Sequence, residues 1–181
     1  MKRIGLLVIG VLVASAGAFA QSSSDIDTAL LAAPARLKEG ATVVKWKPDH
    51  TYETLRKGTN RLVCYDRSGF PEQAPFSIEC TSIANLDRVA QNMKLEALGD
   101  KEKTKAALEA AEKDGSRVKP EYGSVWYHFA GPDREHARPH TTVALPGATA
   151  QSTGIPDNPK QGGVWIMDAG TSTAHLMVPG E

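Results

Sequence analysis

The chain has 181 residues, with 21 Lys and Arg against 21 Asp and Glu, and 41% of its residues are hydrophobic. This near-neutral balance gives no support for binding to nucleic acid or to an anionic membrane, because both favour clustered positive charge. The length is typical of one domain with a sizeable core rather than two.

The first twenty residues have the pattern of an export signal. A basic start, Met1-Lys2-Arg3, precedes the apolar stretch Ile4 to Ala16, and Ala18-Phe19-Ala20 is a small-x-small cleavage site. The apolar stretch is shorter than the roughly 20 residues of a comfortable membrane span, and no later segment approaches that length. We therefore expect cleavage between Ala20 and Gln21, and a periplasmic or secreted protein without a stable membrane span. Cleavage removes two basic residues and no acidic one, so 19 basic residues remain against 21 acidic ones.

The first half of the mature chain predicts a helix followed by strands. Ile26, Ala29, Leu30 and Ala33 have helical spacing behind a Ser or Asp cap. Three β-rich runs follow, at residues 41–46, 51–56 and 61–65. The first two flank Lys47-Pro48-Asp49-His50, which suits a turn, and the economical arrangement of all three is a meander. The Pro-rich and Gly-rich stretch at 66–75 is expected to be a loop.

The second half begins with helix-forming residues from about 85 to 113, interrupted at Gly99-Asp100. The later helix, 101–113, has only one large apolar residue and should lie on the surface. Four further strands are predicted at 124–129, 141–145, 164–167 and 175–178. Residues 146–163 hold four glycines and three prolines, which predicts a long surface loop that is either tied to the structure or mobile.

Cys64 and Cys80 are the only cysteines. An isolated pair in an exported chain tends to form a disulfide, which would stabilise the fold by roughly 3 kcal/mol. Two buried free thiols are the alternative, and a zinc or redox site is less favoured because no C-x-x-C is present. The predicted fold is α+β: residues 21–181 form one domain with an antiparallel sheet of about five to seven strands, two or three helices on one side and one disulfide.

Three stretches together resemble a family of small exported bacterial proteins without an assigned activity. They are Ala41-Thr42-Val43-Val44 with Thr54-Leu55-Arg56-Lys57-Gly58-Thr59-Asn60 and Cys64, the second cysteine Cys80, and the closing strand His175-Leu176-Met177-Val178. The resemblance implies export, a compact β-containing domain and a cysteine pair. It implies no functional residue, and the helical segment near 100–115 is longer than in those relatives.

Three histidines form the best chemical candidate in the chain. His128, His136 and His140 fall within thirteen residues, next to Asp133 and Glu135, and imidazole with carboxylate is a ligand set for zinc, copper, nickel or iron. The spacing does not match H-E-x-x-H, and Pro139 disfavours a helical face. A charged loop with solvated histidines is the favoured interpretation, and a metal site is the alternative.

Other candidate sites are weaker. Asp168, Ser172 and His175 have the residue types of an acyl-transfer triad, but they lie within eight residues around a predicted turn without a nucleophile elbow. Glycines 58, 69, 162 and 163 form no phosphate-binding pattern, and no cofactor is expected. The aromatic residues of the predicted strands are assigned to the core rather than to a ligand face: Trp46, Tyr52, Trp126, Tyr127 and Trp165.

These observations favour an exported, non-catalytic binding or envelope-associated protein. Its partner would be a small molecule or an envelope protein that the residues do not identify. The alternative function is a metal-dependent enzyme or metal carrier that uses His128, His136 and His140.

Overall fold

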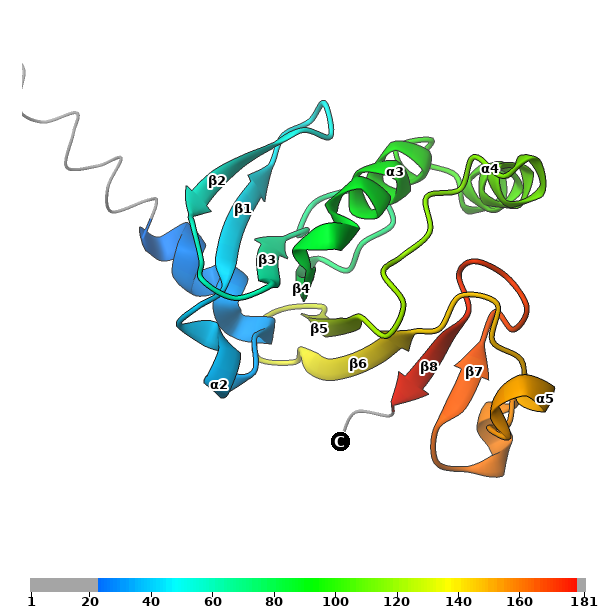
Figure 1. Ribbon diagram of the computed structural model, residues 1–181. Coiled ribbons are helices and arrows are strands. Elements are labelled where there is room, and N and C mark those ends of the chain that lie inside the picture. The colour runs from blue at the N-terminus through cyan, green and yellow to red at the C-terminus, as the bar shows by residue number, and fades with distance from the viewer. Residues whose placement is uncertain (1–22, 179–181) are drawn as a thin grey trace, which may run out of the picture.

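The computed structural model describes residues 23–178, so the signal segment 1–20 and the cleavage site at Ala20 and Gln21 lie outside the described residues. The described part is α+β and contains one mixed sheet of eight strands (Figure 1). The strands are β1 (Thr42–Trp46), β2 (Tyr52–Arg56), β3 (Leu62–Asp66), β4 (Phe76–Ser82), β5 (Val125–Gly131), β6 (Arg138–Ala144), β7 (Trp165–Met167) and β8 (His175–Val178). The helices are residues 23–29, α2 (Ala35–Lys38), α3 (Leu86–Glu96), α4 (Lys101–Asp114) and α5 (Ala150–Thr153), with short 3-10 turns at Leu30–Ala32, Ile83–Asn85 and Pro159–Gln161.

The strand order is β2-β1-β3-β4-β5-β6-β8-β7, and β3 pairs with β1 in parallel. The prediction of a purely antiparallel sheet with a β1-β2-β3 meander was therefore wrong. After β2 the chain crosses the start of β1, where the amides of Thr59 and Asn60 donate to the Gly40 carbonyl at 2.8 and 3.0 Å. A Cβ on Gly58 would lie 2.3 Å from that carbonyl oxygen, so only glycine permits the crossing that places β3 on the far side of β1.

Helices cover both faces of the sheet, rather than the one side that was predicted (Figure 1). On one face Ala29 and Leu30 pack against Val43, Leu62 and the two cysteines. On the other face α3 contributes Leu86, Val89 and Met93, whose spacing of three and four residues forms one apolar stripe. That stripe packs against Val44, Trp46, Val63 and Tyr65. Neighbouring residues of β1 and β3 thus serve two separate apolar clusters, as the period of two in a strand requires.

Cys64 and Cys80 form a disulfide, as predicted. The residues are direct partners in the antiparallel pairing of β3 and β4, and their Cα atoms are 4.1 Å apart. Both are fully buried beneath the N-terminal helical residues. The bridge therefore joins two neighbouring strands inside an apolar cluster.

Strand β4 was not predicted, although it lies at the centre of the sheet between β3 and β5. Its sequence alternates Phe76, Ile78 and Cys80 with polar residues, including Glu79. Ile78 and Cys80 enter the core, while Glu79 is buried on the opposite face together with Arg67. A charged residue in a central strand obscured the strand pattern, because the sequence does not show the buried partner that makes this position tolerable.

The helical segment follows the prediction more closely. Helix α3 ends near Gly99, and α4 starts behind Asp100, whose carboxylate accepts hydrogen bonds from the amides of Glu102 and Lys103. Helix α4 ends at Gly115 with φ 79°, and only Thr104 and Ala111 along it are buried. It is the predicted surface helix, and it lies beside α3, above the connection between β7 and β8, where Glu112 accepts hydrogen bonds from Ser172 (Figure 1).

The stretch from 146 to 163 is tied to the structure rather than free. A capping box between Thr149 and Ser152 starts α5, and Ala148 packs with Ile166 and Ala174 in a third buried cluster. The amide of Ile166 also donates to the carbonyl of Pro156 at 2.8 Å. Within residues 23–178 no helix has the length and apolar character needed to cross a membrane.

Candidate functional site

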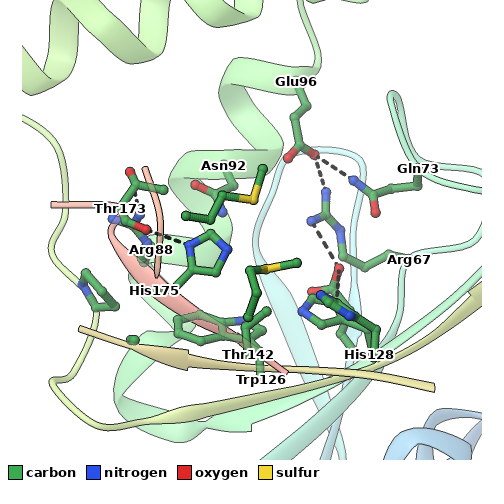
Figure 2. Close-up of a pocket in the computed structure, with 16 residues that line it drawn as sticks. Arg67, Gln73, Arg88, Asn92, Glu96, Trp126, His128, Thr142, Thr173 and His175 are labelled. Carbon is green, nitrogen blue, oxygen red and sulfur yellow. Dashed lines mark hydrogen bonds and ion pairs between the residues drawn. The ribbon is translucent and has the colours of Figure 1, made fainter. Parts of the chain in front are cut away.

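A pocket of about 420 Å³ lies between α3 and the face of the sheet formed by β4 to β8 (Figure 2). Its walls combine three histidines, two arginines, two glutamates, one tryptophan and two methionines. The lining residues are Arg67, Gln73, Glu79, Arg88, Asn92, Glu96, Pro120, Trp126, His128, His140, Thr142, Ala144, Met167, Thr173, His175 and Met177. This volume is in the range of a small-ligand site.

The strand register explains why residues distant in sequence meet here. Direct partners across the sheet share a face, so each set of partners forms a row across the strands. One row runs Tyr65, Glu79, His128 and His140 across β3, β4, β5 and β6. The next contains Trp126, Thr142 and Met177, and the third contains Ala144, His175 and Met167. The floor of the pocket is therefore made by alternate residues of five strands.

Helix α3 supplies the opposite wall. Arg88, Asn92 and Glu96 are four residues apart, so they form a polar stripe beside the apolar stripe that packs on the sheet. The apolar contacts of Val89 and Met93 hold the helix against the sheet and so fix the position of this polar stripe. The spacing of the polar residues was visible in the sequence, but the side of the helix that faces a cavity was not.

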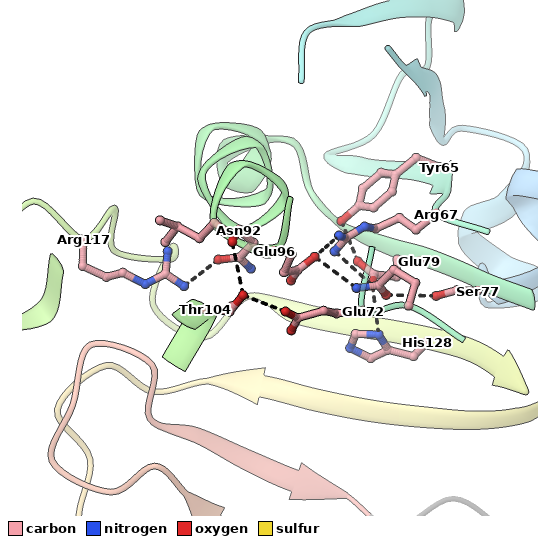
Figure 3. Close-up of polar contacts among 12 residues, drawn as sticks. Tyr65, Arg67, Glu72, Ser77, Glu79, Asn92, Glu96, Thr104, Arg117 and His128 are labelled. Carbon is pink, nitrogen blue, oxygen red and sulfur yellow. Dashed lines mark hydrogen bonds and ion pairs between the residues drawn. The ribbon is translucent and has the colours of Figure 1, made fainter. Parts of the chain in front are cut away.

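A buried charge cluster occupies one end of the pocket (Figure 3). The carboxylate of Glu79 accepts a hydrogen bond from the Tyr65 hydroxyl at 3.1 Å and lies 3.7 Å from Arg67 Nη1. Arg67 also pairs with Glu96, which accepts a second hydrogen bond from Gln73 Nε2 at 3.1 Å. The side chains of Arg67 and Glu79 are only 4% and 9% exposed, so their charges balance each other away from solvent.

The pKa values of this cluster follow from burial and charge. Burial alone would raise the pKa of Glu79, but His128, Arg67 and the Tyr65 hydroxyl outweigh it, so the pKa is lowered. Burial, followed by the Glu79 charge, raises the pKa of Tyr65 well above its ordinary value. The pKa of Arg67 is raised as well, since Glu79 and Glu96 overcome the effect of burial. Glu79 is therefore held ionised beside a neutral Tyr65.

Three imidazoles line the middle of the pocket. The rings of His128 and His140 lie with their centroids 5.7 Å apart, and His128 Nδ1 is 3.7 Å from a Glu79 carboxylate oxygen. His175 Nδ1 is 2.8 Å from the carbonyl oxygen of Thr173, which fixes that ring (Figure 2). Burial, then His128 and His175, lower the pKa of His140. At neutral pH His140 is therefore a neutral ring that can donate one hydrogen bond and accept another.

Arg88 closes the other end of the pocket, near His175 (Figure 2). Its guanidinium donates to the Val118 carbonyl and, at 3.1 Å, to the Thr173 hydroxyl. Among residues 23–178 no carboxylate lies within ion-pair distance of it, although Arg88 is only 4% exposed. Burial, followed by the neighbouring Arg117, lowers the pKa of Arg88 to about 10. The group is still charged at neutral pH, and its charge is poorly compensated.

The structure brings together only two of the three histidines that were considered as metal ligands. His128 and His140 are partners across β5 and β6, while His136 lies in the loop that joins these strands, with its ring 2.8 Å from Asp133 and 65% exposed. His175, which the metal hypothesis did not include, occupies the pocket instead. In the described part of the chain no group of three or more His, Cys, Asp or Glu could hold a metal ion.

The structure also shows where the remaining candidate residues lie and what they contact. Ser172 donates to Glu112 at 2.6 Å and His175 contacts a backbone carbonyl, so the two side chains have other partners, as the turn interpretation implies. Of the aromatic residues assigned to the core, Trp46 is buried, whereas Trp126 is partly exposed and lines the pocket. A ring with free surface in a cavity can contact a ligand as well as the core.

No protein-family model, curated protein or solved structure matches the chain.

Proposed function

We propose that this protein is an exported, non-catalytic binding protein that holds a small molecule in the pocket between α3 and the sheet. Export rests on the signal pattern that ends at Ala20. The resemblance to small exported proteins without an assigned activity agrees with this proposal. Intact-mass measurement of the secreted or periplasmic protein checks the export step, with Gln21 expected as the first residue.

The observation that carries the binding function is the composition of the pocket. It places an apolar surface of Trp126 and two methionines beside histidine, arginine, glutamate and amide side chains, and it is large enough for a ligand of about ten to twenty heavy atoms. Apolar walls provide binding energy through desolvation, while fixed polar groups orient the ligand. The charge of Arg67 is paired with Glu79 and Glu96, and Glu79 also accepts a hydrogen bond from Tyr65, so these side chains form a boundary of the pocket whose charges are compensated within the protein.

The lining residues favour binding over catalysis. They include no Ser, Cys, Lys or Asp, and the Thr173 hydroxyl already accepts a hydrogen bond from Arg88. The imidazoles can act as general bases, but no Ser, Cys or Lys nucleophile lies beside them in the lining, and the lowered pKa of Glu79 disfavours that carboxylate as a base. This set of groups suits holding a ligand and releasing it unchanged.

The experiment introduces a larger side chain into the pocket from strand β6 of the sheet. Thr142 lines the pocket, and Thr141, one residue earlier, points to the opposite face. The neutral fluorescent probe N-phenyl-1-naphthylamine is titrated into wild type, Thr142→Phe and Thr141→Phe. We expect Thr142→Phe to weaken probe binding by about tenfold or more, because the ring occupies the cavity. Thr141→Phe should retain the wild-type affinity.

Two outcomes would contradict the proposal. Equal affinity for wild type and Thr142→Phe in folded protein would mean that the probe binds elsewhere. Chemical conversion of a bound compound, lost in Thr142→Phe, would replace a binding function with a catalytic one. Circular dichroism and the unfolding midpoint of each variant establish that the comparison is between folded proteins.

A further inference from the structure

The two ends of the pocket differ in how well their charges are compensated. At one end Arg67 contacts Glu79 and Glu96, and two hydrogen bonds from Tyr65 and Gln73 complete the carboxylates. At the other end the partners of Arg88 among the described residues are a carbonyl and a hydroxyl. The charges at the Arg67 end are therefore paired within the protein, whereas Arg88 has no carboxylate partner within residues 23–178.

Within residues 23–178 no carboxylate forms an ion pair with Arg88. Glu112 is the carboxylate that acts on it electrostatically, but both oxygens of Glu112 accept hydrogen bonds from Ser172, one from the backbone amide and one from the hydroxyl. Arg117 adds a second positive charge, and its guanidinium bonds to the neutral amides of Gln91 and Asn92. Burying a charge without a partner is unfavourable, which makes this end of the pocket receptive to an anion.

The remaining wall of the pocket is suited to an apolar body. Trp126, Met167 and Met177 lie on the same face of the sheet as His175, in the two rows next to each other. A methionine thioether adapts to flat or irregular apolar groups, and an indole ring stacks on them. His140 and His175 lie on this floor as further polar groups beside the apolar wall.

We propose that the ligand is a small organic carboxylate with an aromatic or aliphatic body, its carboxylate held by Arg88 near His175 and its body against Trp126, Met167 and Met177. This inference rests on the proposed binding function and adds the chemical class of the ligand. A guanidinium binds a carboxylate through paired, charge-assisted hydrogen bonds, which gives both orientation and affinity.

The test compares ligands of equal shape and different charge by isothermal titration calorimetry at pH 7.5 and low salt. The probes are phenylacetate, its neutral isostere phenylacetamide and the cation phenethylamine. We expect phenylacetate to bind about tenfold or more tightly than the amide, and the amine to bind most weakly, because only the carboxylate compensates Arg88. This comparison uses the wild-type protein and does not depend on a variant that folds.

A variant assigns the charge preference to Arg88. Arg88→Gln keeps a hydrogen-bond donor but removes the charge, so the ratio of carboxylate to amide affinity should fall towards one. Arg134→Gln, in the exposed loop between β5 and β6, is the matched control and should keep the wild-type ratio.

The outcomes separate this inference from the proposed function. If phenylacetamide or phenethylamine binds as tightly as phenylacetate, and Thr142→Phe still abolishes binding, the pocket binds ligands but the carboxylate class is wrong. If the charge preference persists in folded Arg88→Gln, Arg88 is not the anchor. If Thr142→Phe leaves binding of every probe unchanged, the proposed function itself fails.

Discussion

Two neighbouring rows of residues cross the same strands and have opposite properties. One row contains Cys64, Cys80 and Tyr127, and its cysteines are covalently joined and sealed under Ala29 and Leu30. The other row, one residue further along β3, contains Tyr65, Glu79, His128 and His140. A single step along a strand therefore separates a row with a buried, cross-linked cysteine pair from a charged row that lines the pocket.

This difference shows how the sheet combines stability with a binding site. The disulfide face gains stability from apolar burial and from restriction of the unfolded chain. The charged face includes desolvated groups, whose cost is offset only while each has its partners. The first face should therefore tolerate changes in pH, while the second should respond to loss of one charge or to protonation.

The largest expected effect is the loss of Arg67. Arg67→Met leaves Glu79 buried without its guanidinium partner, and we expect the free energy of unfolding to fall by about 3–5 kcal/mol. Urea unfolding measures the change. Arg61→Met is the matched control, because Arg61 is 73% exposed in its pair with Glu121 and its loss should cost less than about 1 kcal/mol. Equal effects of both variants would show that the buried charges are not the sensitive element.

A somewhat smaller effect is expected on the opposite face. Replacing both cysteines, as Cys64→Ala with Cys80→Ala, should lower the free energy of unfolding by roughly 3 kcal/mol, because the unfolded chain is no longer cross-linked. Denaturant unfolding measures the loss, and reduction of the wild-type protein should reproduce most of it. Two thiols that alkylate freely in native exported protein would contradict the disulfide.

The smallest effect concerns pH. Because the pKa of His140 is lowered in the folded protein, the unfolded chain takes up a proton more readily than the folded chain. The contribution of His140 is therefore fully present above its ordinary pKa of about 6.5 and is lost as pH falls from there through the lowered value. His140→Gln should flatten this part of the stability profile between pH 8 and 5.5, as measured by urea unfolding at several pH values. The same slope in His140→Gln and wild type would assign the effect to another group.

Part of the candidate site was accessible to sequence reasoning. His128 was placed on a predicted strand, and the period of two puts Trp126 on the same face. His140 was recognised as a candidate but left just before the strand predicted at 141–145, although β6 begins at Arg138 and includes it. His136 was grouped with the other two histidines because it is close to them in sequence. The pairing of β6 with β8 instead places His175 in the pocket with His128 and His140.

The amino-acid sequence by itself determined the local elements: seven of the eight strands, the division of the helical segment at Gly99 and Asp100, and the pairing of the only two cysteines. These features follow from periodicity, capping and the number of thiols, which act between near neighbours or leave one choice. Only the tertiary structure decided that β3 lies parallel to β1, that β4 is central and that three rows of side chains form the pocket. The physical reason is register: hydrogen bonding between distant strands selects which residues become neighbours, and a buried charge such as Glu79 is tolerated only once that register supplies its partners.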